Sequence, residues 1–396
     1  MDRRQDSWRY LMDREGGRSR TAYWKIGCEA QTDTNVEDNL IDQIEATNST
    51  LIMDDIFIQQ AAQLLRKGDT VAFPTETVYG LGADARNTTA VERIFVAKGR
   101  PSDNPLIVHI SDRSQLNDLV LDVHETASRL MDAFWPGPLT LVLPVRPGAV
   151  SPKVTAGLST VAVRMPAHSL ALRLIAAAEC PVAAPSANRS GRPSPTLASH
   201  VEEDLAGLIG GIVDGGPTGV GLESTVAEVA TDGTVTVLRP GSVTADALAR
   251  AAQASVHTEP ALPTGGREDL SPAPRSPGMK YTHYAPRGSL RVVRGTDPAA
   301  VTARVQAELA AAKARGEVTG VLAFDEHLSH YPADVPVSLG SIAALETAAQ
   351  RLYAGLRQFD EAGATFMVAE ACPEEGLGIA VMNRLLKAAG HEVIDV

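Results

Sequence analysis

Short apolar runs alternate with helical patterns along most of this 396-residue chain, and this alternation constrains its fold more than any other feature. Helical patterns lie near residues 89–98, 123–133, 169–178 and 244–253. Because alternation of this kind builds layered α/β domains, we predict a twisted sheet with mixed strand directions. The strand-like runs between residues 70 and 250 are TVAF, LIVHI, LTLVL, TVAVRM, PVAAPS, STVAEV and TVTVLR.

A proline-rich segment divides the alternating pattern into two parts. Six prolines lie between residues 260 and 286, and proline at that density disfavours helices. The alternation restarts near residue 290 and lacks a GxGxxG turn, so no dinucleotide site is predicted there. The predicted parts are a mobile N-terminal extension at 1–50, an α/β domain at 51–254, a proline-rich linker at 255–289 and a smaller Rossmann-like domain at 290–396.

Composition excludes several classes of protein. The net charge of −12 disfavours generic nucleic-acid binding, which needs Lys and Arg against phosphates, so an anionic ligand needs a local basic pocket. The three cysteines, Cys28, Cys180 and Cys372, are too far apart for a disulfide framework or a zinc site. With no apolar run of roughly 18 residues and a charged N-terminus, we expect a cytoplasmic protein that does not cross a membrane.

The stretch FPTETVYGLGADA, residues 73–85, ends an apolar run with unusual polar chemistry. Thr75, Glu76 and Thr77 follow one another, and Tyr79 comes two residues later. An ordinary turn needs only Gly, Pro, Asn or Asp. The hydroxyls therefore either bind a small polar ligand or satisfy local backbone groups. The small residues Gly80 and Gly82 are predicted to let a ligand approach the backbone.

A second polar stretch, AKGRPSDNPLIVHI at residues 97–110, begins where a helical pattern ends. Thr89 and Glu92 are spaced as in a capping box at the start of that helix. Lys98 at its end either complements the helix C-terminus or, with Arg100, binds a polyphosphate. His109 alternates with apolar residues on the next strand and is either structural or a ligand contact.

Three further stretches repeat this pattern of hydroxyls and cations at strand ends. Arg164 ends an apolar strand, and a buried arginine needs an anionic partner, either a structural acid or a substrate carboxylate. Open α/β sheets bind ligands at such strand ends, so we predict an anionic ligand there. No Walker A motif, nucleophile elbow or HExxH motif is present. The other two stretches are APSANRSGRPSPT at 184–196 and GLESTVAEV at 221–229, and VLRPG at 237–241 repeats the strand-end arginine with Arg239.

Taken together and in this order, the five stretches resemble the YrdC-like family in its long two-domain form. The resemblance covers about residues 55–250, and SPGMKYTHYAP and PEEGLGIAVMNRLLKAAG are also similar to the long form. It implies a YrdC-like domain and a nucleotidyltransferase that makes threonylcarbamoyl-AMP and pyrophosphate from L-threonine, bicarbonate and ATP. The product serves tRNA threonylcarbamoyladenosine modification, with a downstream tRNA threonylcarbamoyl-transfer complex as partner and Mg²⁺ as cofactor.

The resemblance also implies roles for residues at matching motif positions, with catalysis by positioning rather than by a nucleophile. Arg164 would face the threonine carboxylate, and Tyr284 in the linker would close over the nucleotide. Asn104 and Asn188 match less closely. The metal ligands stay open, with Glu76 and Glu223 as candidates. The threonine set is Thr75, His109, Arg164 and Ser224, and the ATP set is Lys98, Arg100, Thr160, Ser186, Ser194, Arg239 and Tyr284.

Two other functions compete with the synthesis of threonylcarbamoyl-AMP as interpretations of this sequence. Hydrogenase-maturation carbamoyltransferases contain a YrdC-like domain, but they also carry CxxC zinc fingers, which three scattered cysteines exclude. An RNA-binding module without catalysis is the alternative. The mildly basic tail at 1–50 either touches RNA or is a solvated extension, and the C-terminal domain has a structural or regulatory role by default.

Overall fold

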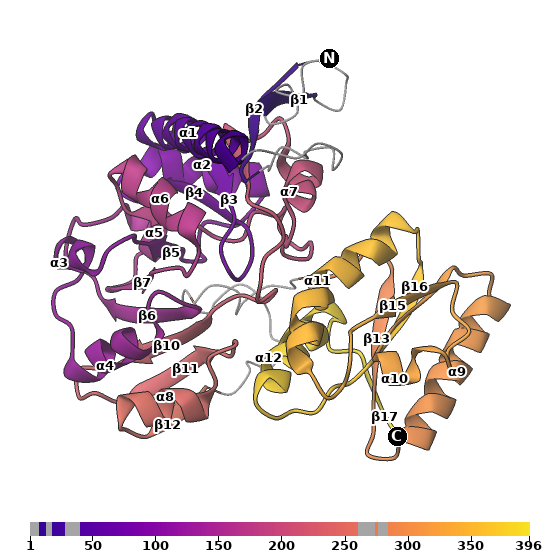
Figure 1. Cartoon of the computed structure of the whole chain (residues 1–396). Helices are drawn as coiled ribbons and strands as arrows, with labels where there is room; N and C mark the ends of the chain where they lie inside the picture. Colours follow the sequence, from indigo (N-terminus) through magenta and orange to yellow (C-terminus); the bar gives the residue numbers. More distant parts are fainter. Residues whose placement is uncertain (1–7, 13–17, 28–39, 260–273, 276–283) are drawn as a thin grey trace.

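The computed structural model describes residues 8–12, 18–27, 40–259, 274–275 and 284–396, and it shows two α/β parts side by side (Figure 1). Most of the predicted linker, residues 260–273 and 276–283, lies outside the described residues, as do 1–7, 13–17 and 28–39 of the predicted extension. Among the helices described, none has both the length and the apolar character needed to cross a membrane.

The first part contains one large sheet and most of the helices. Its strands are β1 Trp8–Met12, β2 Arg18–Lys25, β3 Val71–Phe73, β4 Gly80–Asp84, β5 Ile107–His109, β6 Leu139–Pro144, β7 Thr160–Arg164, β8 Val182–Ala183, β9 Gly211–Asp214, β10 Thr225–Val229, β11 Val235–Arg239 and β12 Val256–Thr258. Its helices are α1 Leu40–Arg66, α2 Thr88–Lys98, η2 Arg113–Gln115, α3 Leu116–Leu119, α4 Glu125–Phe134, α5 Pro152–Thr155, α6 Ser169–Ala178, α7 Ala198–Leu205 and α8 Ala245–Ala252.

The second part is a smaller domain with its own sheet. Its strands are β13 Ser289–Arg294, β14 Thr319–Ala323, β15 Val335–Ser338, β16 Phe366–Glu370 and β17 Val393–Asp395. Its helices are α9 Pro298–Ala314, α10 Asp325–Leu328, α11 Leu345–Glu361 and α12 Leu377–Ala388. All strand pairs of this sheet are parallel, in the order β15-β14-β16-β13-β17, which agrees with the predicted Rossmann-like domain.

The large sheet has 12 strands and mixed directions, as predicted. Its order is β1-β2-β9-β3-β4-β8-β5-β7-β6-β10-β11-β12. β3 and β4 are antiparallel, whereas β5 and β7 are parallel, as are β6 and β10. Side chains alternate across the sheet. Val71 and Phe73 pack with α1 and α6 in one apolar cluster, and Ala72 joins α2, α4, α7 and α8 in another, so helices cover both faces.

Two segments of the predicted N-terminal extension, Trp8–Met12 and Arg18–Lys25, form strands β1 and β2 of the large sheet. Strand β2 pairs in parallel with β9, and Tyr23 and Trp24 are buried. Gly211 lacks a Cβ where one would come within 2.4 Å of the Trp24 ring, so this glycine admits the tryptophan. Burial of these aromatic rings fixes the strand, and the sequence alone gave no sign of the partner strand.

Local chemistry explains several element boundaries. The side chain of Asn87 accepts a hydrogen bond from the backbone N–H of Ala90, so Asn87 caps α2 and the predicted capping box of Thr89 and Glu92 is wrong. Gly82 lies in β4 rather than in a turn, and a Cβ there would meet Val182 at 2.7 Å. This glycine therefore permits close packing of side chains, not ligand approach as predicted.

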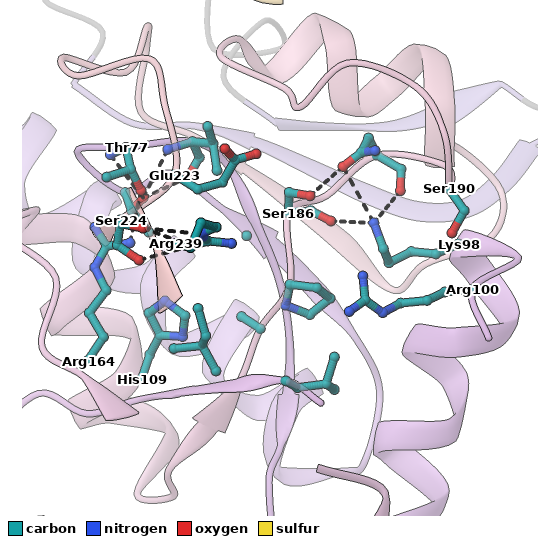
Figure 2. A pocket seen from close by; sticks show the side chains of 18 of the residues that line it. Thr77, Lys98, Arg100, His109, Arg164, Ser186, Ser190, Glu223, Ser224 and Arg239 are labelled. Atoms are coloured by element: carbon teal, nitrogen blue, oxygen red, sulfur yellow. Dashed lines mark hydrogen bonds between the residues drawn. The ribbon is translucent and has the colours of Figure 1, made fainter. Parts of the chain in front are cut away.

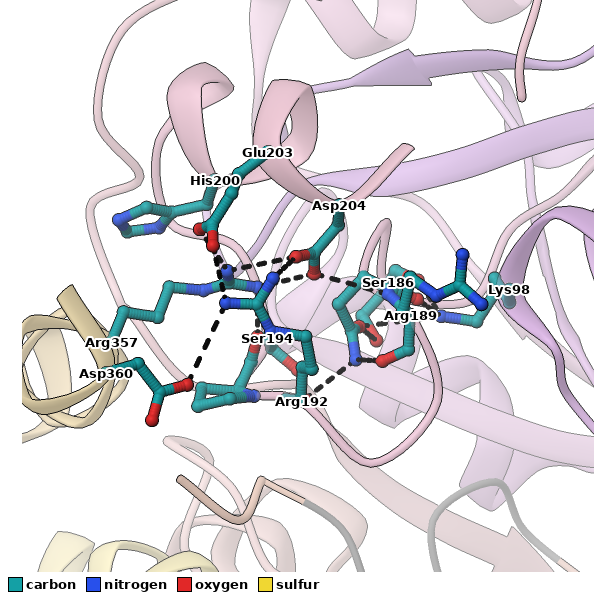
Figure 3. A network of polar contacts seen from close by, with 12 residues as sticks. Lys98, Ser186, Arg189, Arg192, Ser194, His200, Glu203, Asp204, Arg357 and Asp360 are labelled. Atoms are coloured by element: carbon teal, nitrogen blue, oxygen red, sulfur yellow. Dashed lines mark hydrogen bonds and ion pairs between the residues drawn. The ribbon is translucent and has the colours of Figure 1, made fainter. Parts of the chain in front are cut away.

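The C-terminal domain docks against the first domain through α11 and α12 (Figure 1). Arg357 of α11 is fully buried, forms an ion pair with Asp204 at 2.8 Å and donates to the Pro193 carbonyl at 2.6 Å (Figure 3). Asp204 also pairs with Arg192 of the loop between β8 and α7. This shared network ties the loop that follows β8 to the second domain.

Gly221 lets α11 approach the first domain closely, and replacing it by alanine should weaken that contact. Its φ is +82°, and a Cβ would lie 2.4 Å from the Ala349 carbonyl oxygen. Gly216 has the same φ with open space around it, so Gly216→Ala is a matched control for backbone strain alone. We expect both variants to lose about 1–3 kcal/mol of unfolding free energy from the left-handed conformation. In urea unfolding, Gly221→Ala should lose a further ~1–3 kcal/mol from overpacking; equal losses in the two variants would contradict the close contact.

Candidate active site

A cavity opens where several strands of the large sheet end (Figure 2). Thr75 follows β3, His109 ends β5, Arg164 ends β7 and Arg239 ends β11. The residues predicted for the threonine and ATP sets come together there, except Thr160 and Ser194. The lining residues are Thr75, Thr77, Val78, Gly80, Lys98, Arg100, Leu106, Ile107, His109, Arg164, Ala184, Pro185, Ser186, Asn188, Ser190, Glu223, Ser224, Arg239 and Tyr284.

One side of the cavity is built around Arg164. Its Nη1 donates to the Thr77 hydroxyl at 2.9 Å, and its Nε donates to the Gly137 carbonyl at 3.2 Å. Its Nη2 forms an ion pair with Glu76 at 2.6 Å, and both side chains are largely buried. Of the two partners considered from sequence, the structure thus shows an acid of the protein itself. Thr75 in turn exchanges a hydrogen bond with Thr77 at 2.8 Å, so the opening stretch and Arg164 form one polar unit.

His109 lies buried beside this unit, and its Nδ1 has no hydrogen-bond partner among the described residues. Burial, with the nearby charge of Arg164, lowers the pKa of the imidazole to about 3. The ring is therefore neutral near pH 7. A neutral imidazole with a free nitrogen in a cavity wall can donate to or accept from a polar ligand.

We expect the His109 imidazole to stay neutral between pH 5 and 8. Its unfolded pKa is about 6.5, so the unfolded chain takes up a proton first, and this residue lowers folding stability progressively as the pH falls from 6.5 towards about 3. Nitrogen NMR of labelled imidazole, assigned with a His109→Ala variant, should show constant shifts over that range. A midpoint near pH 6.5 would contradict the buried, unprotonated state.

Lys98 occupies the other side of the cavity and is 2% exposed. Its Nζ donates to the Ser186 carbonyl at 2.6 Å and also to the Asn188 carbonyl. The end of α2 is capped instead by Gly99, whose N–H reaches the carbonyls of Phe95 and Val96. Complementing the helix terminus therefore does not account for this lysine. Burial, reinforced by the charge of Arg100, holds the Lys98 pKa well below its usual range.

Ser224 and Arg239 form another part of the cavity wall. The Arg239 guanidinium donates to the Ser224 carbonyl at 3.0 Å and to its hydroxyl at 3.3 Å. The Ser224 hydroxyl also exchanges a hydrogen bond with Thr140 at 2.8 Å. Burial, together with Arg384, lowers the pKa of Arg239 from its usual value. The cavity therefore offers buried cations whose charge an anionic ligand would stabilise.

Glu223 is a carboxylate in this cationic wall. Its Oε1 accepts from the Ser194 hydroxyl at 2.6 Å, and its Oε2 accepts from the Tyr353 hydroxyl at 2.8 Å and from Arg384 at 3.1 Å. Burial alone would raise its pKa, but the charges of Arg384 and Arg239 outweigh burial, and the pKa falls to about 2. Glu223 is thus ionised and paired.

The structure places several candidates away from the cavity wall. Thr160 begins β7, at the opposite end of the strand from Arg164. Ser194 is fully buried behind Glu223. Asn104 is fully buried, and neither atom of its amide has a hydrogen-bond partner within the part of the chain that the structure describes. Asn188, by contrast, lines the cavity and accepts from the Ser186 hydroxyl at 2.5 Å.

No cluster of three or more His, Cys, Asp or Glu side chains suited to a metal ion occurs in the described part of the chain. Both metal-ligand candidates are engaged by arginines, Glu76 by Arg164 and Glu223 by Arg384. The residues do not fit a metal site built from protein carboxylates.

The sequence reasoning missed some residues of the site. Ser190 lines the cavity and lies in the stretch already singled out. Tyr353 and Arg384 reach the site from α11 and α12. Tyr353 lies within a helical pattern, where an aromatic residue looks ordinary. Arg384 lies in PEEGLGIAVMNRLLKAAG, a stretch that resembles the long form of the family but to which no site role was assigned.

The fold and the cavity define a class of protein. Hydroxyls and buried cations at the strand ends of an open α/β sheet bind small anionic metabolites or nucleotides. The sequence contains no Walker A motif. The protein is therefore a small-molecule-binding protein of the α/β type without a P-loop.

Comparisons with known proteins narrow this class. The profile of a family described as Telomere recombination matches residues 63–241, and that of the threonylcarbamoyl-AMP synthase C-terminal domain matches 243–390. The chain is 53% identical to threonylcarbamoyl-AMP synthase of Bacillus subtilis strain 168 over 344 residues, 87% of this chain and 96% of that one. It is 47% identical to the Pyrococcus abyssi protein of the same name over 339 residues, 86% of this chain and 96% of the relative.

A solved structure agrees with these sequence relatives. The crystal structure of P. abyssi Sua5 complexed with L-threonine superposes with a TM-score of 0.80 at 46% identity, covering 86% of this chain and 96% of that one. The chain therefore belongs to the threonylcarbamoyl-AMP synthase family, in the form that carries a second, C-terminal domain. The resemblance found in the sequence is confirmed.

Proposed function

We propose that this protein is a nucleotidyltransferase that makes threonylcarbamoyl-AMP and pyrophosphate from L-threonine, bicarbonate and ATP. The observation that carries the proposal is one cavity with two differently built sides, one around Arg164 and one around Lys98. Family membership supports the same reaction, because the close relatives carry the name threonylcarbamoyl-AMP synthase. The product would serve tRNA threonylcarbamoyladenosine synthesis in the cytoplasm, through a downstream transfer complex.

L-threonine is assigned to the Arg164 side of the cavity. A guanidinium binds a carboxylate through parallel hydrogen bonds, and Arg164 is held in place by Thr77 and Gly137. His109 and Ser224 would contact the amino and hydroxyl groups, and Thr75 would complete the wall. The relative solved with L-threonine shows that a protein of this fold binds this amino acid.

ATP is assigned to the Lys98 side of the cavity. Lys98, Arg100 and Arg239 bring positive charge to a polyphosphate, with Ser186 and Asn188 as neighbouring donors. Tyr284 lines the cavity and is buried, with its ring centroid 4.9 Å from that of Tyr353, and it would cover this side from the linker. Thr160 and Ser194 lie outside the cavity wall and would join the ATP set only after local rearrangement.

The reaction needs alignment and charge neutralisation more than covalent help. Bicarbonate dehydrates to carbon dioxide, the threonine amine adds to it and loses a proton, and a carbamate forms. A carbamate oxygen then attacks the α-phosphorus of ATP, and the bond to pyrophosphate breaks. The buried cations would stabilise charge on the leaving pyrophosphate. Mg²⁺ would arrive with the phosphates and be held mainly by them and by water, since the described carboxylates are paired.

Pyrophosphate release tests this function, with threonine and bicarbonate each omitted in turn from a mixture containing ATP and Mg²⁺. We expect release only when both are present. Pyrophosphate release that does not depend on threonine would favour another carbamoyl-transfer reaction. No release from the folded protein, with RNA binding that threonine does not alter, would favour the RNA-binding module instead.

A further inference from the structure

Two side chains of the C-terminal domain meet a carboxylate of the active-site cavity. The hydroxyl of Tyr353 in α11 donates a hydrogen bond to Glu223 Oε2 at 2.8 Å. Arg384 of α12 donates to the same carboxylate oxygen at 3.1 Å. Arg384 and Tyr353 are fully buried. Glu223 lines the cavity, and Tyr353 and Arg384 lie 130 and 161 residues from it in sequence. Both therefore contact the site through a single oxygen of Glu223.

Arg384 also spans the ends of two neighbouring strands. Its Nη1 donates to the Pro240 carbonyl at 2.5 Å, and its Nη2 donates to the Glu223 carbonyl at 3.4 Å. Pro240 directly follows Arg239, and Glu223 directly precedes Ser224. One rigid guanidinium therefore fixes the spacing between the two backbone positions that carry Arg239 and Ser224 into the cavity.

Glu223 also holds a third segment, the loop that contains Ser194. Its second oxygen accepts from Ser194, in the loop that follows β8 and carries Ser186 and Asn188. An ionised carboxylate buried among cations keeps one position only while its hydrogen bonds are made. The charged or titratable groups that act on it are Lys98, Arg239, Tyr284, Tyr353, Arg384 and Lys387.

We propose that Tyr353 and Arg384 are positioning residues for the ATP side of the cavity, acting through Glu223. This inference rests on the proposed function, and it gives the C-terminal domain a part in substrate binding beyond covering the first domain. The Arg164 side of the cavity has its own anchors, Thr77, Glu76 and Gly137, none of which contacts α11 or α12 in the interactions described. Removing the contacts of Tyr353 and Arg384 disturbs only Ser224 among the residues assigned to threonine, whereas it disturbs Arg239 and the loop of Ser186 and Asn188 on the ATP side. ATP binding should therefore weaken more than threonine binding.

Tyr353→Phe is the cleanest variant, because it removes one hydroxyl and keeps the ring that stacks on Tyr284. Arg384→Lys keeps the charge but cannot span a carboxylate and two carbonyls, and Arg384→Gln removes the charge. The control is Arg351→Gln, an exposed arginine of α11 that contacts Ser338 on the far side of its helix from this cluster. Circular dichroism and melting temperature establish that each variant is folded.

The measurements are ATP and L-threonine dissociation constants, each by calorimetry with the other substrate absent, and the KM values in pyrophosphate release. We expect Tyr353→Phe to weaken ATP binding about tenfold, since a hydrogen bond to a charged group is lost. Arg384→Gln should weaken it further and Arg384→Lys by an intermediate amount, while threonine affinity changes less than about threefold in each.

Wild-type ATP affinity in folded Tyr353→Phe and Arg384→Lys would overturn the positioning role. Equal losses for ATP and threonine would overturn it too, because a general loosening of the fold does not discriminate between the substrates. If the arginine variants do not fold, the ATP and threonine affinities of Tyr353→Phe alone test the positioning role. A wild-type protein that binds ATP but releases no pyrophosphate with threonine would instead contradict the proposed function, so the two failures are distinguishable.

Discussion

Replacing Lys98 by alanine will reduce threonine-dependent pyrophosphate release by about a hundredfold or more, the range seen when one preorganised charge-stabilising group is removed. The lysine is buried and held by the carbonyls of Ser186 and Asn188, which aim its ammonium into the cavity. Its pKa is held well below its usual range, and a polyphosphate would restore the charged form. ATP binding should therefore take up a proton when the pH lies above the Lys98 pKa of the free site.

Steady-state assays of pyrophosphate release measure the loss of activity. Calorimetry of ATP binding in two buffers of different ionisation enthalpy measures the proton uptake. The matched control is Arg93→Ala, which removes an exposed cation from the same helix and should leave activity unchanged. Lys98→Ala leaves carbonyls without their donor, so about 1–3 kcal/mol of unfolding free energy is lost, less than a typical domain's stability. A folded, fully active Lys98→Ala protein would contradict the phosphate assignment.

Replacing Arg164 by glutamine will weaken L-threonine binding by about a hundredfold or more, because the loss of one partner of a buried, hydrogen-bonded charge pair costs about 2–5 kcal/mol. ATP affinity should be nearly unchanged, since Arg164 contacts Thr77, Gly137 and Glu76 and none of the ATP set. Calorimetry with each substrate alone measures the two affinities.

Stability complicates that variant, because it leaves the largely buried Glu76 without its cation. Breaking such a pair costs about 3–5 kcal/mol. The double variant Glu76→Gln and Arg164→Gln removes both charges and should recover much of the stability without recovering threonine binding. Threonine binding restored in the double variant would show that Arg164 serves the fold rather than the substrate.

Features carried by local sequence were predictable. The strands containing His109 and Arg164 are continuous apolar runs, and their polar residues stand at the ends, where an open α/β sheet binds ligands. Ala349, Leu352 and Leu356 recur at helical spacing in the sequence, and all three are buried on one side of α11. Motif order then identified the family, because five stretches in sequence carry more information than any one of them.

Features that depend on distant partners were not predictable. Strands β4 and β9 begin with glycine, which disfavours strands locally, and they form because neighbouring strands and the Trp24 ring pack against those glycines. The pairing of Glu76 with Arg164 joins residues 88 apart in sequence. The pairing of Glu223 with Arg384 crosses between domains, and no spacing rule connects them.

The most direct test of the central claim is the product itself. The purified protein is mixed with ATP, Mg²⁺, L-threonine and ¹³C-bicarbonate, and the reaction is quenched early and analysed by mass spectrometry. We predict threonylcarbamoyl-AMP carrying one heavy carbon, formed in step with pyrophosphate and about a hundredfold or more scarcer in the Lys98→Ala reaction. Hydrolysis of ATP to AMP and pyrophosphate without any labelled adenylate would contradict the claim that this cavity joins the three substrates.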